Sequence, residues 1–153
     1  MVFFLSSAET LYLNSNEFTG GLEPIGELTS LKEFDAHGNS FVGTLPADLF
    51  QNMKRLEVLR LSSNRFQGSI PPSLGSCSNL RDVMLEDNQM TGQIPVELGD
   101  LRILKRLTIQ KNQIIGTMPS HVCDLTNIRL TYLAADCERP SPKVFCSCCD
   151  QCF

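Results

Sequence analysis

Apolar residues recur along this chain in a frame that repeats about every two dozen residues. The clearest copies read LRLSSNRFQGSIP over 59–71, VMLEDNQMTGQIP over 83–95 and LTIQKNQIIGTMP over 107–119. Because successive side chains of a strand face opposite sides, the apolar-x-apolar step that opens each copy predicts a short strand with two inward side chains. A frame repeated in this way predicts coils that stack on their neighbours and share one continuous core.

Each full copy carries an asparagine three residues after its last inward strand position. These residues are Asn16, Asn39, Asn64, Asn88 and Asn112, with gaps of 23, 25, 24 and 24 residues. A carboxamide both donates and accepts hydrogen bonds, so we expect the five side chains to form a ladder that joins the backbones of adjacent coils. A sixth, degenerate copy follows, in which Leu125, Ile128 and Leu133 keep the spacing and Asp136 stands at the asparagine position.

The rest of the frame predicts a second packed row and a short helix in each coil. Two residues after the asparagines, we expect a buried apolar spine of Phe18, Phe41, Phe66, Met90 and Ile114, each contributing about 1.5–3 kcal/mol. A glycine two residues further on marks a tight bend, and a proline then suits the first turn of a helix. The inner face of that helix is expected to bury Leu49, Leu74, Leu98 and Val122.

The full frame, Leu-x-x-Leu-x-Leu-x-x-Asn-x-Phe-x-Gly-x-Ile-Pro, resembles the plant-type leucine-rich repeat of receptor-like kinases, receptor-like proteins and polygalacturonase-inhibitor-like proteins. The resemblance implies an α/β repeat fold, a right-handed solenoid with a parallel concave β-sheet, a short second β layer and convex 3₁₀ or short helices. It also implies recognition of peptides, proteins or glycans rather than catalysis. The cysteine-rich end is similar to the C-terminal cap of secreted or membrane-anchored repeat proteins of diatoms.

Two parts are expected from this pattern. Residues 1–136 would form the solenoid of about six coils, and residues 137–153 would form a cysteine-rich C-terminal cap. Because the chain opens inside a repeat, we expect an upstream portion that holds the N-terminal cap and a secretory signal. No run of apolar residues is long enough to cross a bilayer.

Six of the seven cysteines crowd into the last part of the chain. They are Cys123, Cys137, Cys146, Cys148, Cys149 and Cys152. Disulfides are favoured, because a structural zinc site usually shows two separated Cys-x-x-Cys pairs; a metal site from the last four cysteines and regulatory thiols are the alternatives. Six cysteines allow 15 pairings, of which the sequence disfavours only those that join the adjacent Cys148 and Cys149. Cys77 takes a leucine position and is expected to be a buried free thiol.

Charge and cysteine content point to an extracellular or cell-surface protein that does not bind nucleic acid. The chain has 13 basic and 17 acidic residues and a net charge of −4, and its charged residues are scattered among the repeats, so no basic stripe is expected that could follow a phosphate backbone. Dense cysteines are typical of oxidising compartments. Neither a cofactor nor a metal is expected.

The outward strand positions carry the candidate ligand-binding residues, because packing leaves these positions free to vary. They are Tyr12, Asp35, His37, Arg60, Met84, Glu86, Arg106, Thr108 and Tyr132. The predicted register puts Tyr132 beside Thr108 in a central column. Aromatic and arginine side chains dominate many interfaces, so Tyr12, Arg60 and Tyr132 are the expected anchors.

The function predicted on these grounds is a non-catalytic recognition module, part of a receptor-like ectodomain or secreted, that binds a peptide, protein or glycan. An inhibitor of a wall-degrading hydrolase and a structural cell-surface scaffold without a specific ligand are the alternatives. His121, Cys123 and Asp124 hold the residue types of a thiol hydrolase, but catalytic groups of such enzymes meet across a fold rather than within one turn.

Overall fold

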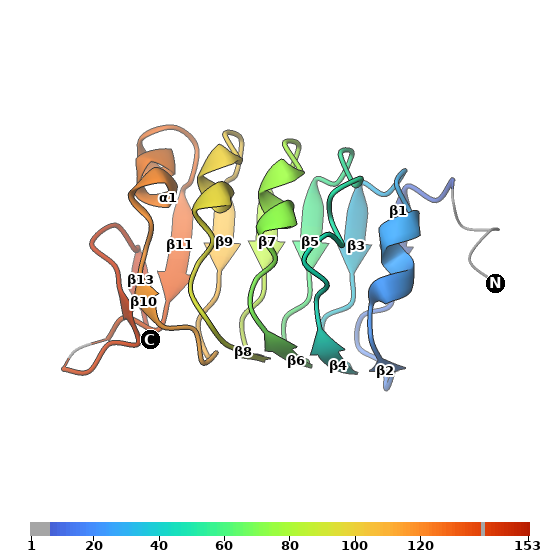
Figure 1. The fold of residues 1–153 in the computed structure, drawn as a ribbon, viewed down its shortest axis with the longest axis horizontal. Helices are drawn as coiled ribbons and strands as arrows, with labels where there is room; N and C mark the ends of the chain where they lie inside the picture. The colour runs from blue at the N-terminus through green and yellow to red at the C-terminus, as the bar shows by residue number, and fades with distance from the viewer. Residues whose placement is uncertain (1–6, 139) are drawn as a thin grey trace.

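The computed structural model describes residues 7–138 and 140–153 and arranges them as a row of stacked coils (Figure 1). Residues 1–6, where the expected solenoid begins, and residue 139 lie outside the described residues. Each coil adds one strand to a seven-stranded parallel sheet. In sheet order the strands are β1 (Thr10–Tyr12), β3 (Glu33–Asp35), β5 (Val58–Arg60), β7 (Asp82–Met84), β9 (Arg106–Thr108), β11 (Tyr132–Ala135) and β13 (Gln151–Cys152). The predicted solenoid is confirmed.

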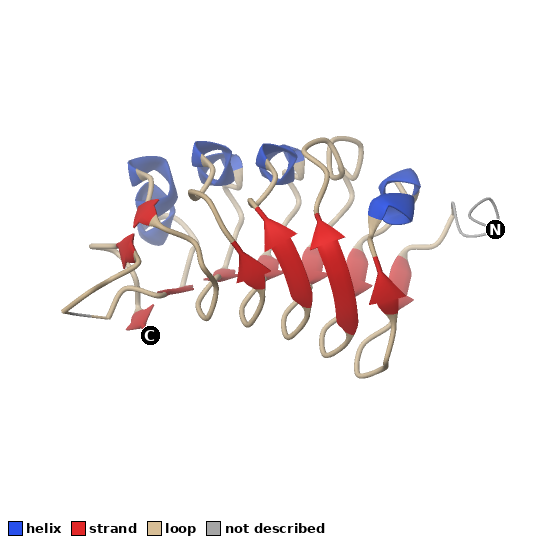
Figure 2. Cartoon of the chain, turned by 60° about the horizontal axis from the view of Figure 1, so that its bottom comes forward, coloured by secondary structure: helices blue, strands red, loops and turns tan. Residues whose placement is uncertain are grey.

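A second layer of short parallel strands lies beside this sheet (Figure 2). It consists of a group of four and a pair, namely β2 (Thr19–Gly20), β4 (Ser40–Thr44), β6 (Arg65–Gly68) and β8 (Gln89–Met90), and β10 (Gly116–Thr117) with β12 (Val144–Phe145). Gly68 and Gly92, at two of the bends, have φ of 71° and 80°, a region that glycine enters without steric cost.

Short helices cover the side opposite the main sheet. They are η2 (Glu23–Glu27), η3 (Pro72–Ser76), η4 (Val96–Asp100), α1 (Ser120–Asp124) and η5 (Leu125–Asn127). The second coil replaces the helix by turns, yet it still buries Leu49. The inward side chains of the other coils, Leu74, Leu98 and Val122, are fully buried as predicted.

One continuous core runs between the three layers. Its strand positions Phe34, Leu59, Val83, Leu107 and Leu133 are all 0% exposed. The spine beneath the second layer is buried from Phe41 to Ile114, and the Phe41 and Phe66 rings stack with centroids 6.1 Å apart. The prediction for Phe18 was wrong: it is 46% exposed, because it lies on the first coil and packs on one side only, against Phe41.

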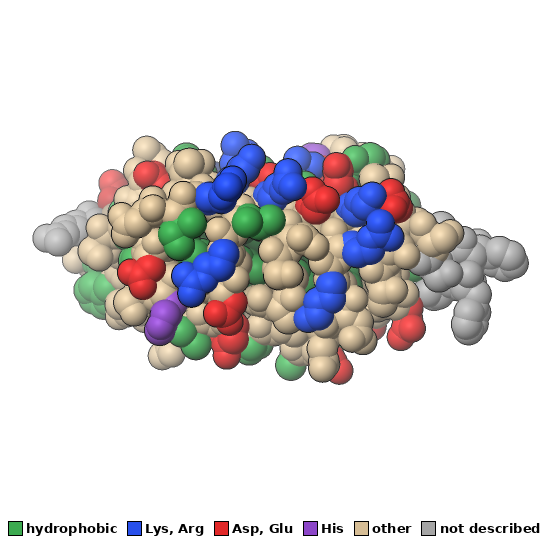
Figure 3. Space-filling view, turned by 90° about the horizontal axis from the view of Figure 1, so that it is seen from above, with side chains coloured by type: hydrophobic (Ala, Val, Ile, Leu, Met, Phe, Trp, Pro, Cys, Tyr) green, Lys and Arg blue, Asp and Glu red, His purple; other side chains and the backbone are tan. Residues whose placement is uncertain are grey.

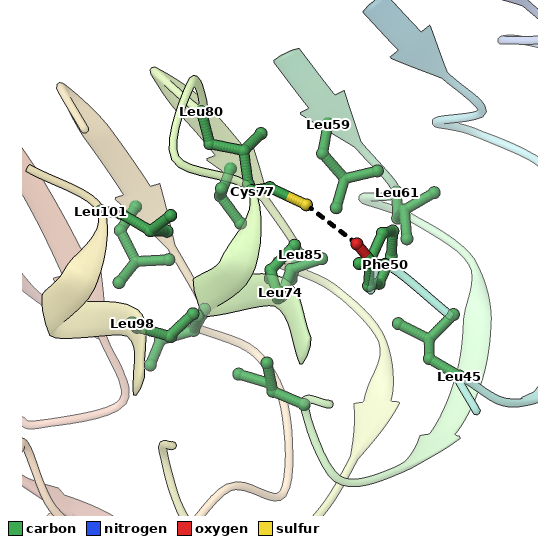
Figure 4. Close-up of a cluster of buried hydrophobic side chains, with 14 of the residues drawn as sticks. Leu45, Phe50, Leu59, Leu61, Leu74, Cys77, Leu80, Leu85, Leu98 and Leu101 are labelled. Atoms are coloured by element: carbon green, nitrogen blue, oxygen red, sulfur yellow. Dashed lines mark hydrogen bonds between the residues drawn. The ribbon is translucent and has the colours of Figure 1, made fainter. Parts of the chain in front are cut away.

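Cys77 lies inside this core, as predicted (Figure 4). Its Sγ lies 3.4 Å from the carbonyl oxygen of Phe50, among the buried leucines of neighbouring coils. Loss of solvation raises the pKa of the thiol to about 11, so Cys77 stays protonated and unreactive at neutral pH.

The register predicted for the sixth coil was wrong by two residues. Strand pairing sets Tyr132 beside Arg106, Leu133 beside Leu107 and Ala134 beside Thr108. The distance from Pro119 to Leu133 is 14 residues, against 12 from Pro95 to Leu107, and the extra helical residues of α1 and η5 take up the difference.

This shift changes which residues of the sixth coil are buried. Leu130 is buried, whereas the expected core residue Ile128 is 51% exposed. Asp136 therefore does not occupy the asparagine position, although its carboxylate accepts hydrogen bonds from the backbone amides of Lys111 and Asn112. Ala135 occupies the last inward strand position of the sixth coil. Because alanine is small, this position does not stand out as part of the apolar repeat pattern in the sequence.

No helix in the described part of the chain is both long and apolar enough to span a lipid bilayer.

Candidate ligand-binding surface

The asparagine side chains fix the backbone that presents the main sheet. Asn64 shows the arrangement: its Nδ2 donates to the carbonyl oxygens of Ala36, Leu61 and Ser62, and its Oδ1 accepts from the backbone amide of Phe41. Asn39, Asn88 and Asn112 repeat this pattern. Among residues 7–138 and 140–153, the Asn16 side chain donates to the carbonyl oxygens of Leu13 and Asn14 in its own coil. The ladder therefore ties each coil to the one before it.

Disulfides tie the tail to the last coils. Cys123 bonds to Cys148, Cys137 to Cys152 and Cys146 to Cys149, which confirms that all six cysteines form disulfides. The metal and regulatory-thiol alternatives fail because these sulfurs are bonded to one another. The thiol-hydrolase constellation fails for the same reason, since Cys123 has no free thiol.

The tail also continues the solenoid, which the sequence did not indicate. Strand β12 pairs in parallel with β10, and β13 pairs in parallel with β11. The carboxylate of Asp150 accepts a hydrogen bond from the backbone amide of Leu133. The tail thus covers the backbone groups of the sixth coil with a seventh strand.

The outward side of the seven-stranded sheet, called the sheet face below, is the expected concave surface. Strand pairing sets Tyr12, Asp35, Arg60, Met84 and Thr108 side by side in one column, as predicted. Ala134, rather than the expected Tyr132, continues that column. The same register places Tyr132 in the neighbouring column, next to Arg106.

Near the first coils, the candidate residues form a network around a buried carboxylate. Asp35 is only 7% exposed, and one of its carboxylate oxygens lies 2.7 Å from His37 Nδ1 and 3.1 Å from the backbone nitrogen of His37, which donates to it. The other oxygen lies 3.4 Å from a guanidinium nitrogen of Arg60. Asp35 therefore orients its neighbours, and His37 and Arg60 present the surface.

Tyr12 stands at the edge of this network and is 56% exposed. Its hydroxyl donates to the carboxylate of Glu33, and this hydrogen bond raises the pKa of the tyrosine above its ordinary value. The phenol of Tyr12 therefore stays neutral at pH 7.

Near the last coils, five of the candidate residues line one hollow of about 310 Å³. They are Met84, Glu86, Arg106, Thr108 and Tyr132, and Gln110 completes the lining. The guanidinium carbon of Arg106 lies 5.8 Å from the centre of the Tyr132 ring, and its Nε lies 3.9 Å from Asp82. The hydroxyl of Thr108 donates to Glu86. The register shift that removes Tyr132 from the central column is what builds this hollow.

Gln110 was not among the candidate residues and has an unusual environment. It is 8% exposed, and its Oε1 is the one buried side-chain oxygen or nitrogen without a hydrogen-bond partner among residues 7–138 and 140–153. An unsatisfied buried acceptor costs about 1–3 kcal/mol. The outward strand pattern identifies position 110, but only packing reveals that its carboxamide is buried and unpaired.

Comparison with known proteins shows which repeat family the sequence resembles. A family model described as Leucine Rich Repeat matches residues 55–77. Receptor-like protein 39 of Arabidopsis thaliana is 35% identical over 78 residues, which cover 49% of this chain and 9% of the relative. The aligned segments span about a tenth of the curated relatives, 9% and 10% for the first two.

Solved structures extend the similarity to nearly the whole chain. Pollen Receptor Kinase 3 superposes with a TM-score of 0.78 and 28% identity, covering 99% of this chain and 67% of that one. The Arabidopsis receptor kinase HAESA, in complex with the peptide hormone IDA and the co-receptor SERK1, superposes with a TM-score of 0.75 and 29% identity, covering 83% of this chain and 21% of that one. The chain therefore carries leucine-rich repeats, which are similar to those of plant receptor-like proteins and receptor kinases.

Proposed function

We propose that this chain is a non-catalytic recognition module that binds a peptide segment across its sheet face. The observation that carries the proposal is the hollow lined by Met84, Glu86, Arg106, Gln110 and Tyr132, which opens on a sheet whose backbone is fixed by the asparagine ladder. A rigid surface loses little conformational entropy on binding. The outward strand side chains, which differ from coil to coil, therefore lie on a rigid surface where they can contact a ligand.

The lining of the hollow suits a peptide. Met84 and Tyr132 offer apolar contact, while Arg106 and Glu86 offer one charge of each sign. Because the last torsion of a glutamine side chain is soft, the Gln110 carboxamide can turn either its oxygen or its nitrogen toward a ligand. A peptide group carries one donor and one acceptor, so it complements either orientation. At about 310 Å³ the hollow has the volume for one side chain and its adjoining backbone.

The relatives support the same class of ligand. HAESA is a receptor kinase whose structure was solved with a peptide hormone bound. Its repeats superpose on 83% of the present chain. An extracellular location fits this role, because three disulfides persist in oxidising compartments. A solenoid over residues 1–136 and a cap over 137–153 are part of the proposal.

The test is selection of binding peptides from a random displayed library, followed by calorimetry of the selected peptides. We expect Tyr132→Ala and Arg106→Ala each to weaken binding at least about tenfold, which corresponds to about 1.4 kcal/mol. Arg65→Ala, on the exposed side of β6, is the matched control and should change the affinity less than about twofold. Selected peptides that bind both variants as tightly as the parent protein would refute the proposal.

A further inference from the structure

Basic side chains gather along one long edge of the molecule. The edge consists of the segments that lead into the strands of the main sheet, at residues 7–9, 28–32, 53–57, 77–81, 101–105 and 128–131. In the view from above, Lys and Arg side chains run along much of the molecule (Figure 3). The basic residues of the six loops are Lys32, Lys54, Arg55, Arg81, Arg102, Lys105 and Arg129, and we call this set the basic edge.

The charge of the basic edge is opposite to that of the rest of the chain. Its loops hold seven basic and two acidic residues, whereas the remaining sequence holds six basic and fifteen acidic residues. In the linear sequence the basic residues look scattered, because one coil separates each from the next. Folding brings them into one row, so the prediction that the chain has no basic stripe was wrong.

Backbone hydrogen bonds fix the spacing of this row. The amide of Arg81 donates to the carbonyl oxygen of Glu57, Lys105 donates to Arg81, and Thr131 donates to Lys105. Adjacent loops therefore follow each other at the inter-strand spacing of roughly 4.8 Å. Basic groups so close together repel one another, which makes an opposite charge laid along the row favourable.

The acidic residues of these loops neutralise only part of the row. Glu9 lies 2.8 Å from the amine of Lys32 and 3.1 Å from the guanidinium of Arg55, and Glu57 lies 3.6 Å from Arg81. In the described residues, no ion pair is formed by the other basic side chains, Lys54, Arg102, Lys105 and Arg129. Two of these, Arg102 and Lys105, are exposed and lie in one loop.

We propose that the basic edge binds an acidic polysaccharide, a chain of sugars that carries carboxylate or sulfate groups. A linear polyanion can present successive charges to successive coils. The three disulfides favour an extracellular polymer over nucleic acid, since they place the protein in an oxidising compartment. This surface is separate from the hollow on the sheet face, so it provides attachment to an anionic matrix while the sheet face stays open.

The experiment measures binding of the whole chain to heparin, which is sulfated, and to polygalacturonate, which is carboxylated, by calorimetry in low salt. We expect saturable binding to at least one of the two, no binding to neutral dextran, and an affinity that falls steeply as salt screens the charges. Arg102→Gln/Lys105→Gln should lower the affinity at least tenfold. The matched pair Arg65→Gln/Lys111→Gln removes the same charges elsewhere and should change it less than twofold.

Three outcomes would overturn the proposal: no saturable binding to either polysaccharide, an equal loss in both double variants, or tighter binding to single-stranded DNA or to anionic phospholipid vesicles. Circular dichroism of each variant shows that the fold is retained. The Tyr132→Ala variant tests the sheet face and the Arg102→Gln/Lys105→Gln variant tests the basic edge, so either proposal can fail while the other stands.

Discussion

The inner coils and the last coil of this molecule fill the same positions of one repeat in different ways. A Cβ on Gly75 would lie 2.2 Å from the carbonyl oxygen of Glu97, and a Cβ on Gly99 would lie 2.5 Å from the Cβ of His121. In the last coil the corresponding residue is Cys123, whose side chain instead bonds to Cys148 of the tail. An inner coil is held by close approach of its neighbours, whereas the last coil is held by a covalent cover.

The backbone of these two regions is also satisfied differently. Inner coils use asparagines such as Asn64, which reach both to the preceding coil and to their own. The sixth coil has Asp136, whose carboxylate accepts from backbone amides of the preceding coil, and the carboxylate of Asp150 in the tail accepts from the amide of Leu133. The last coil of a repeat protein is stable only when its unpaired backbone groups form hydrogen bonds with a segment that is not another repeat.

The largest expected effect comes from breaking the ladder inside the stack. Asn64→Ala removes the acceptor of the Phe41 amide and one donor from each of three carbonyl oxygens, so the free energy of unfolding should fall by about 3–4 kcal/mol. Asn16→Ala, which loses bonds within one exposed coil, should cost less than about 1 kcal/mol. Urea unfolding of both variants measures the difference, and equal losses would contradict the account.

The second largest effect on stability is expected from removing a disulfide that holds the tail over the last coil. Cys137→Ser/Cys152→Ser opens a link across a sequence separation of 15 and should lower the free energy of unfolding by about 3 kcal/mol. Amide hydrogen exchange should rise first in β11 and β13, because these strands lose the link between them. Cys146→Ser/Cys149→Ser, which opens a separation of 3, is the control and should have the smaller effect. Faster exchange spread evenly over all coils would argue against a local cap.

Crowding between coils gives an intermediate effect. A methyl group in Gly75→Ala would meet the backbone of η4, which cannot yield as a flexible side chain does, so we expect a loss of about 1–3 kcal/mol. The control is Gly21→Ala, whose Cβ would meet only the end of the Glu23 side chain and should change stability by less than about 0.5 kcal/mol. Thermal melts of the two variants test this, and a neutral Gly75→Ala would show that the coils are less closely packed.

The smallest effect concerns Cys77. With a thiol pKa of about 11, the thiolate fraction at pH 8 is only about one in a thousand, and the sulfur is also buried. A thiol reagent should therefore label the native protein slowly, at a rate set by opening of the core, and labelling should become fast in urea. Rapid labelling of the native protein would show that this part of the core opens readily.

The sequence predicted the interior of the solenoid because each inner coil repeats the same packing problem. The strand positions, the asparagines and the glycine bends follow from contacts with identical neighbours. The structure of the sixth coil and the tail could not be predicted in this way. Ala135 hides the register of the sixth coil, the two additional helical residues shift it, and nothing in the spacing of the cysteines shows that the tail adds a strand.

The candidate surface was predictable to a similar degree. Outward strand positions gave the columns, but two of the candidates, Asp35 and Thr108, are buried in networks with their neighbours. The hollow depends on Tyr132 standing beside Arg106, which only the corrected register shows. Burial of Gln110 is likewise a property of the packed sheet rather than of its own position in the repeat.

Nuclear magnetic resonance mapping of a selected peptide on the isotope-labelled chain tests the central claim most directly. The account predicts that the largest shifts fall on the lining of the hollow, at Met84, Glu86, Arg106, Gln110 and Tyr132. Shifts confined to the helices or to the second strand layer, with the hollow unchanged, would contradict it.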